Sequence, residues 1–261
     1  MSDGSLADAY SRTGAAWDAG PGRIYDRLSE ELVARLPAGA TGDVLDLGAG
    51  TGAASRAAAA AGAEHVVAID LASGLLAVNA SDRPPAVVGD ARVLPFRDGA
   101  FDAVVAAFSL NHIPDPRTSL SEIARVLRPD GSVAVSAYST DDSHPVKEVV
   151  RAACAARGWV APEWYWQLQR EAMPRLATPE RALAEASGVL PGARADVVRV
   201  AFPELDRHAL VAWRLGMAYL APFVASLDEP ARAALIEEAV AHVGEAPLVR
   251  SIVVLTWAKP A

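Results

Sequence analysis

The segment with the clearest chemical signature is VLDLGAGTG, residues 44–52, in which three alternating glycines follow an acidic residue. Glycine accepts positive φ and lets the backbone pass close to a ligand. An alanine-rich helical stretch follows the loop, and a helix N-terminus offers free N–H groups to a polar or anionic ligand. This order of residues predicts a binding loop between a strand and a helix, with Asp46 just before it.

Two more carboxylates end later apolar segments. Asp70 closes EHVVAID, 20 residues after Gly50, and Asp90 closes PAVVGD. An acid at the end of the second strand of a nucleotide-binding α/β fold accepts ribose hydroxyls, for which a carboxylate has two oxygens. Asp90 would accept from an adenine amino group or cap its own turn. Since open sheets bind ligands at the carboxyl ends of their strands, we expect all three acids in one crevice.

Short apolar segments alternate with helical ones and predict the elements that carry these residues. The apolar segments are short and continuous, as expected of strands that helices cover on both faces. This pattern is typical of a parallel sheet in a doubly wound α/β fold. The predicted strands are 43–48, 64–70, 85–90, 101–109, 131–138, 195–202 and 249–257. The predicted helices are 24–36, 51–61, 73–80, 145–157 and 206–225. Two more are predicted: one is capped by Asp115 with Pro116 at its first position, and the other runs from Asp228 to Gly244.

Composition excludes several classes of protein. The 261 residues carry 24 Lys and Arg against 32 Asp and Glu, a net charge of −8, whereas a dedicated nucleic-acid binder is normally basic. The single cysteine, Cys154, rules out a disulfide framework and favours a reducing cytoplasm. The N-terminus lacks the pattern of a secretory signal, and no segment is apolar enough to span a membrane.

Two cofactors fit the glycine loop. Gly48, Gly50 and Ala53 satisfy a loose dinucleotide fingerprint, which would make the protein an NAD-dependent oxidoreductase. Asp46 and Asp90 are not part of that fingerprint, and the Tyr-x-x-x-Lys pair of short-chain dehydrogenases is missing from the sequence.

Taken together, the motifs resemble the class I S-adenosylmethionine-dependent methyltransferases, in the small-molecule group related to the ubiquinone/menaquinone enzymes. VLDLGAGTG resembles the first motif, VVAID the second, VVGDARVLPF the third, and FDAVVAAFSLNHIPD with LRPDGSVAVS the fourth and its neighbour. The resemblance covers residues 41–140. It implies a Rossmann-like, mostly parallel seven-stranded sheet whose reversed last strand is inserted between strands five and six.

The resemblance also implies S-adenosylmethionine as cofactor and assigns its contacts. Gly48, Ala49 and Gly50 would pass its methionine part, which Phe108 would border. Asp70 would hold the ribose with Leu71 packed beside it, Asp90 and Ala91 would meet the adenine, and Asp46 would shape the loop or meet the amino group. Arg23 and Tyr25 would reach the cofactor carboxylate or lie on the surface.

The implied chemistry is methyl transfer to an oxygen, nitrogen or carbon of a small, partly apolar acceptor. His112, in SLNHIPD, would be the general base or a wall of the pocket, and Asn111 replaces a histidine common in relatives. The walls of the acceptor site would come from Tyr10, Trp17, Trp164, Trp213 and Met217, although such aromatic and apolar side chains are also typical of core packing or of a dimer face. No metal is expected, because Asp141-Asp142 is interpreted as a solvated turn.

The chain divides into six segments on this interpretation. They are a helical cap (1–40), the cofactor-binding core (41–140), a helical lid segment (141–192), a strand (193–203), a second helical insertion (204–247) and the final strand (248–261). We expect a monomer or homodimer, with a role in specialised metabolism. The alternative within the same fold is a methyltransferase-like protein that binds the cofactor but catalyses another reaction, such as a cyclisation.

Overall fold

The computed structural model describes residues 3–78, 80–81 and 83–261. Seven strands form one sheet in the order β3-β2-β1-β4-β5-β7-β6. Their bounds are β1 Asp43–Leu47, β2 His65–Asp70, β3 Ala86–Val88, β4 Phe101–Ala107, β5 Leu127–Tyr138, β6 Arg194–Phe202 and β7 Leu248–Ala258. β1 to β5 pair in parallel, and β7 is antiparallel to both β5 and β6. The predicted Rossmann-like sheet, with its reversed strand between strands five and six, is confirmed.

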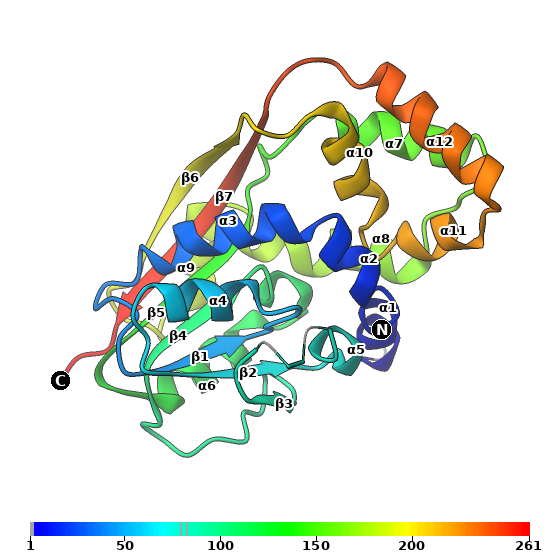
Figure 1. The fold of residues 1–261 in the computed structure, drawn as a ribbon. Helices are drawn as coiled ribbons and strands as arrows, with labels where there is room; N and C mark the ends of the chain where they lie inside the picture. Colours follow the sequence, from blue (N-terminus) through cyan, green and yellow to red (C-terminus); the bar gives the residue numbers. More distant parts are fainter. Residues whose placement is uncertain (1–2, 79, 82) are drawn as a thin grey trace.

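Helices cover both faces of this sheet (Figure 1). The larger ones are α3 Gly22–Val33, α4 Ala53–Ala60, α6 Pro116–Val126, α7 Val146–Ala155, α9 Pro179–Ala186, α10 Arg207–Leu215 and α12 Glu229–His242. The shorter ones are α1 Asp3–Ser11, α2 Gly14–Ala19, α5 Ser73–Leu76, η1 Leu110–His112, α8 Glu163–Gln167, η2 Leu168–Ala172, η3 Met173–Leu176 and α11 Ala221–Ser226.

The alternation of side chains along each strand sorts the core into two layers. Val44 and Val105 pack in one cluster with α3 and α4, whereas Leu45 and Val104 pack in another with α6 and α9. Even-numbered residues of β7, such as Ile252, share the face of α3. Asp46 follows Val44 at a spacing of two and therefore also lies on the α3 and α4 face.

The helical segments gather beyond the strand ends. Figure 1 shows α7, α10, α11 and α12 together at one end of the molecule, with α1 and α2 beside the carboxyl ends of β1 and β2. This arrangement places the predicted cap and the two predicted insertions around the edge at which an open parallel sheet binds ligands.

The predicted single helix over 206–225 is wrong. The chain forms α10, a turn and then α11, because Gly216 ends the first helix and Pro222 stands in the first turn of the second. A Cβ at Gly216 would lie 2.6 Å from both the Ala16 carbonyl oxygen and Pro21 Cδ, so α2 packs directly against this turn. Trp213 and Met217 therefore do not lie on one continuous helix face.

Two predicted boundaries and one predicted helix cap also differ from the structure. The helix predicted over 73–80 ends at Leu76. Position 79 of that range and positions 1–2 of the predicted cap lie outside the described residues. β5 begins at Leu127 because the turn before residue 131 forms a bulge, with Asp130 at φ 64°. Asp115 stands at the start of α6 as predicted, but its carboxylate accepts from the Thr118 hydroxyl instead of a backbone N–H.

Candidate active site

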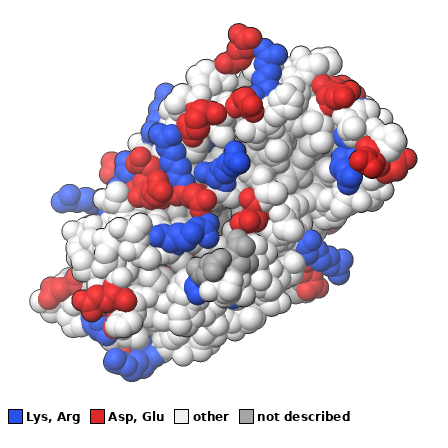
Figure 2. Space-filling model, viewed as in Figure 1, with Lys and Arg blue, Asp and Glu red and all other residues white. Residues whose placement is uncertain are grey.

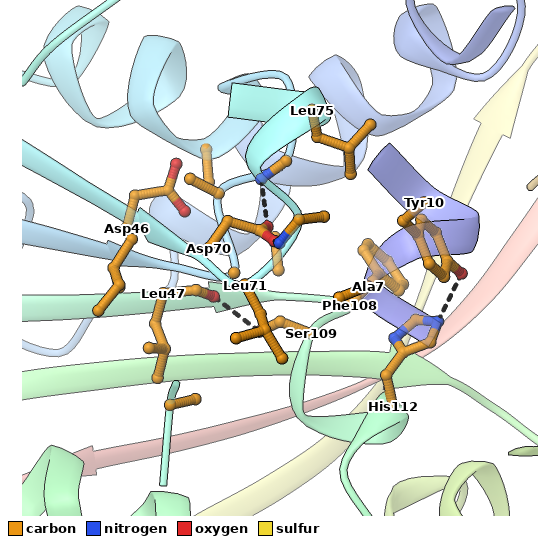
Figure 3. A pocket seen from close by; sticks show the side chains of 18 of the residues that line it. Ala7, Tyr10, Asp46, Leu47, Asp70, Leu71, Leu75, Phe108, Ser109 and His112 are labelled. Atoms are coloured by element: carbon orange, nitrogen blue, oxygen red, sulfur yellow. Dashed lines mark hydrogen bonds between the residues drawn. The ribbon is translucent and has the colours of Figure 1, made fainter. Parts of the chain in front are cut away.

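A cavity at the carboxyl ends of the central strands brings the predicted cofactor residues together (Figure 3). We call it the first cavity. Its lining includes all nine of them: Asp46, Gly48, Ala49, Gly50, Asp70, Leu71, Asp90, Ala91 and Phe108. Tyr10, Trp17, Tyr25 and His112 line it as well, so the helical cap and η1 contribute to the same wall.

The glycine loop is held in a shape that other residues do not readily adopt. Gly48 has a φ of 74°, and a Cβ there would lie 2.2 Å from Ser109 Cβ. The loop also uses its own N–H groups. Those of Gly48 and Ala49 donate to the Ile69 carbonyl at 2.8 and 3.0 Å, and that of Gly50 donates to Asp70 at 2.8 Å. These amides are therefore not free to bind a pyrophosphate.

Asp46 is buried behind this loop with one carboxylate oxygen satisfied. Oδ2 accepts from Ser55 Oγ at 2.6 Å, whereas Oδ1 is buried with no hydrogen-bond partner in the part of the chain that the structure describes. Burial raises the pKa of Asp46 to about 6, opposed by the Ser55 bonds and reinforced by the charge of Asp70. A buried carboxylate oxygen that lacks a donor is suited to a cationic group such as an ammonium.

Asp70 connects the loop to the turn after β2. Its two oxygens accept from the N–H groups of Gly50 at 2.8 Å and Ala72 at 2.7 Å (Figure 3). Burial raises its pKa, and the backbone donors oppose the rise. Each carboxylate oxygen has a second lone pair, so the side chain can position the loop and still accept from a ligand hydroxyl.

Asp90 lies in the cavity wall but is already engaged. Its carboxylate accepts from the Arg92 backbone N–H at 2.8 Å and from the Arg92 guanidinium at 2.6 Å, and this pairing lowers its pKa. Of the two interpretations of Asp90 from the sequence, the structure therefore shows the one in which its carboxylate caps its own turn. Contact with a ligand base at this place would come from its free lone pairs or from Ala91 beside it.

Leu71 and Phe108 form apolar parts of the first cavity. Leu71 is 41% exposed at its rim. Phe108 is buried with a φ of 54°, a left-handed backbone that is uncommon for a bulky residue and is often found at functional sites. Its ring packs on Tyr25 and Tyr138 at 5.3 and 4.5 Å between centroids.

His112 lies where η1 meets the cap. Its Nε2 is 2.9 Å from the Tyr10 hydroxyl, and the two rings meet edge to face (Figure 3). Burial lowers the pKa of His112 to about 4, against the influence of the Phe108 and Ser109 carbonyls. The ring is therefore neutral at pH 7. We assign its proton to Nδ1, which leaves Nε2 to accept from Tyr10.

A second cavity of about 500 Å³ begins at His112 and extends into the helical segments. Tyr10, Tyr25 and His112 line both cavities, so the two meet at these residues. Among the predicted acceptor residues, Trp213 and Met217 line the second cavity and Trp17 lines the first. Trp164 lines neither, because its ring packs behind Tyr10 at 6.3 Å. Arg23 is exposed and also lines neither cavity.

The prediction of a solvated Asp141-Asp142 turn is wrong for Asp142. Its side chain is 2% exposed and pairs with Arg250, whose Nε and Nη2 donate at 2.8 and 2.6 Å, and with Lys147 Nζ at 2.6 Å. Burial raises its pKa, but the two cations prevail and hold it below the ordinary value. Asp141 is exposed, so the two neighbours have opposite environments.

Several residues of the second cavity were missed by the sequence analysis: Tyr138, Asp142, Lys147, Tyr165, Arg214, Tyr219 and Arg250. Two of them did carry a signal. Arg214 follows Trp213 within an apolar helix, and Arg250 stands in the apolar strand VRSIVVLTW. A charge embedded in a buried segment implies a partner or a ligand.

The remaining sequence predictions concern residues away from both cavities. Cys154 is buried and burial raises its thiol pKa to about 11, as expected of an unreactive core cysteine. His144 Nδ1 accepts from the Val146 N–H at the start of α7. Within the described residues, no three acidic, His or Cys side chains come together as a metal site, and no helix has the length and apolarity to cross a bilayer. On the face in Figure 2, acidic and basic side chains are interspersed.

Comparison with known proteins agrees with this geometry. A family model described as a methyltransferase domain matches residues 45–135. A demethylmenaquinone methyltransferase of Mycolicibacterium gilvum is 42% identical over 140 residues, which is 54% of this chain and 59% of that protein. The match therefore spans less than two thirds of the relative.

Two solved structures share the fold. One is a phosphoethanolamine N-methyltransferase of Haemonchus contortus in complex with phosphomonomethylethanolamine and S-adenosylhomocysteine, with a TM-score of 0.57, 21% identity, and coverage of 90% of this chain and 53% of that one. The other is the [4+2]-cyclase SpnF, with a TM-score of 0.56, 23% identity, and coverage of 90% and 81%.

Residues 45–135 therefore match a methyltransferase domain, and the chain shares its fold with a solved methyltransferase structure. The chain is similar to demethylmenaquinone methyltransferases over about half of its length.

Proposed function

We propose that this protein binds S-adenosylmethionine in the first cavity and transfers its methyl group to a quinone-like aromatic small molecule. The observation that carries the proposal is the meeting of all nine predicted cofactor residues in one cavity, around an unpartnered Asp46 oxygen. When bound, the cofactor supplies a methyl group on a positively charged sulfur, which is a good leaving group.

The chain's own residues would bind the cofactor, align it with the acceptor and exclude water. Asp46 would receive the cofactor's ammonium group, and Asp70 its ribose hydroxyls. Tyr10, Trp17 and Phe108 would border the reacting region and keep water from it. His112, neutral at pH 7, would accept a proton from the acceptor through the Tyr10 hydroxyl. A cytoplasmic location and a role in specialised metabolism belong to this proposal, as does action as a monomer or homodimer.

The charge of the first cavity favours this cofactor over NAD. Two carboxylates, the buried Asp46 and the half-buried Asp70, face a loop whose amides are already used. Such a site attracts a cation and repels a pyrophosphate. Calorimetric titration with S-adenosylmethionine, S-adenosylhomocysteine and NAD tests the proposal: the two sulfur compounds should bind, and binding of NAD alone would refute it.

Replacing Asp70 with alanine should weaken S-adenosylhomocysteine binding by roughly 5- to 150-fold, the cost of about 1–3 kcal/mol for leaving buried hydroxyls without an acceptor. Calorimetry measures the loss, and circular dichroism checks the loop, because Asp70 also holds the Gly50 N–H. Asp196→Ala removes an exposed carboxylate from β6 and is the matched control. Equal affinity in Asp70→Ala and the control would contradict the ribose assignment.

Cofactor binding should also weaken in acid. With a pKa of about 6, Asp46 is charged at pH 7.5 and mostly protonated at pH 5, so its attraction for an ammonium is lost as the pH falls. We expect about tenfold lower S-adenosylmethionine affinity at pH 5 than at pH 7.5. In Asp46→Asn the affinity should be low at both values. A wild-type pH dependence that survives in Asp46→Asn would assign the effect to another group.

A further inference from the structure

The second cavity contains more positive charge than its own acids can balance. Lys147, Arg181, Arg214 and Arg250 line it, against a single carboxylate, Asp142. Asp142 is fully used, since Arg250, Lys147 and the Ser251 N–H all donate to it. Arg181 is exposed and donates to the Pro174 carbonyl. At least one buried cation is therefore left without an acidic partner.

That cation is Arg214. Its residue is 8% exposed, and no described residue places a carboxylate within 4 Å of it. Its contacts are the Tyr219 hydroxyl and the rings of Trp213 and Tyr219 at 5.0 and 5.6 Å. Burial lowers its pKa to about 10, and the charge of Arg250 adds to the effect. A buried guanidinium in such surroundings is costly unless a ligand neutralises it.

The unpartnered polar atoms of the same cavity are mostly donors. Arg214 Nε, Arg250 Nη1 and Trp213 Nε1 are buried N–H groups with no acceptor among the described residues. Two unmatched atoms of the lining residues can accept: Asn111 Oδ1, and the Tyr138 hydroxyl, which can also donate. An excess of donors calls for a ligand rich in acceptor oxygens, and carboxylate and phosphate groups match the planar fork of arginine.

The remaining walls are aromatic. Tyr138, Tyr165, Trp213 and Tyr219 line the cavity, and Tyr165 stacks on Tyr219 with centroids 3.9 Å apart. The Arg250 guanidinium lies over the rings of Tyr138 and Trp213 at 4.0 and 4.6 Å. Flat aromatic walls in a cavity of about 500 Å³ suit an aromatic ring of drug-like size.

We infer that the methyl acceptor is an aromatic anion whose acidic oxygen group binds at Arg214 in the second cavity. The inference rests on the proposed function, because the two cavities meet at Tyr10, Tyr25 and His112, where the nucleophile would face the methyl group. The acidic group is an anchor and not the nucleophile. Nothing in the quinone-like assignment requires such a group, so this narrows the acceptor class.

Three probes with one ring system test the inference on protein saturated with S-adenosylhomocysteine: 1-hydroxy-2-naphthoate, 1-naphthyl phosphate and neutral 1-naphthol. Calorimetry or probe fluorescence gives each affinity. We expect one of the anions to bind at least about tenfold more tightly than 1-naphthol, as charge-assisted hydrogen bonds do. The tighter anion identifies the acidic group. Equal or tighter binding of 1-naphthol would overturn the inference.

Arg214→Met should abolish this preference, bringing the anions to within about threefold of 1-naphthol. Arg207→Met is the matched control, because Arg207 starts the same helix, has a side chain that is 41% exposed and pairs with Glu245. A second readout separates anchoring from a structural role. Without ligand, Arg214→Met should keep or raise the Tm, since an uncompensated buried charge is removed. A lowered Tm with the anion preference intact would make Arg214 structural and refute the inference.

The binding of S-adenosylhomocysteine in the same titrations separates the two proposals. Cofactor binding without anion preference would leave the proposed function standing and overturn the inference. Anion preference in a protein that does not bind S-adenosylhomocysteine would support the anion site and overturn the proposed function.

Discussion

Asp142→Ala is expected to lower the free energy of unfolding by about 3–5 kcal/mol, the cost of breaking a buried ion pair by removing one partner. The substitution leaves Arg250, 3% exposed, and Lys147 without an acid. It also removes the acceptor of the Ser251 N–H on β7. Urea denaturation followed by circular dichroism measures the difference.

Asp141→Ala is the matched control, because Asp141 is the neighbouring residue, carries the same charge and has an exposed side chain. It should change the unfolding free energy by less than about 0.5 kcal/mol, as surface substitutions generally do. If the two variants were equally stable, the buried network around Asp142 would contribute little to the fold.

The pH dependence of this effect has a definite sign. The folded-state pKa of Asp142 is lowered from its ordinary value of 3.8, so the stability it contributes is complete above that value and is lost as the pH falls through the folded pKa. The gap in unfolding free energy between the wild type and Asp142→Asn should therefore hold at pH 6 and shrink below pH 3.8.

The first cavity could be predicted from the sequence because short-range rules fix its parts. A strand, a glycine turn and a helix place Asp46 and Gly48 relative to each other, and parallel pairing of β1 with β2 brings Asp70 to the same edge. The hydrogen bonds of Asp90 within its own turn also agree with one of the two interpretations that the sequence allowed. The contacts of Asp70 with Gly50 depend on the same local geometry.

The second cavity could not be predicted in this way. Its residues come from β5, α7, α8, α10 and β7, and Asp142 pairs with a residue 108 positions further along the chain. The sequence pattern does not specify how α7 and α10 pack beyond the sheet. Two adjacent acids were interpreted as a polar turn, although the embedded Arg250 required a buried partner. The break after α10 did carry a local signal in Gly216 and Pro222, whereas the close approach of α2 to Gly216 depends on packing that the sequence pattern does not specify.

His112→Ala should slow methyl transfer by about 100-fold, which corresponds to about 2.7 kcal/mol of transition-state stabilisation and is typical of a lost general base. The rate is measured with methyl-labelled S-adenosylmethionine and a saturating aromatic acceptor carrying a hydroxyl group. S-adenosylhomocysteine affinity should change little, because the loss concerns proton transfer. A fall in rate of less than tenfold would make His112 a wall of the pocket.

Tyr10→Phe distinguishes two routes for the proton. Nε2 of His112 is occupied by the Tyr10 hydroxyl at 2.9 Å, and both side chains line both cavities. If the acceptor passes its proton to the Tyr10 oxygen while Tyr10 donates to His112, each single variant should lose a similar amount of activity. The double variant should then lose no more than either, since residues that act as a unit are not additive. Full activity in Tyr10→Phe with a slow His112→Ala would instead mean that His112 meets the acceptor directly once Nε2 is released.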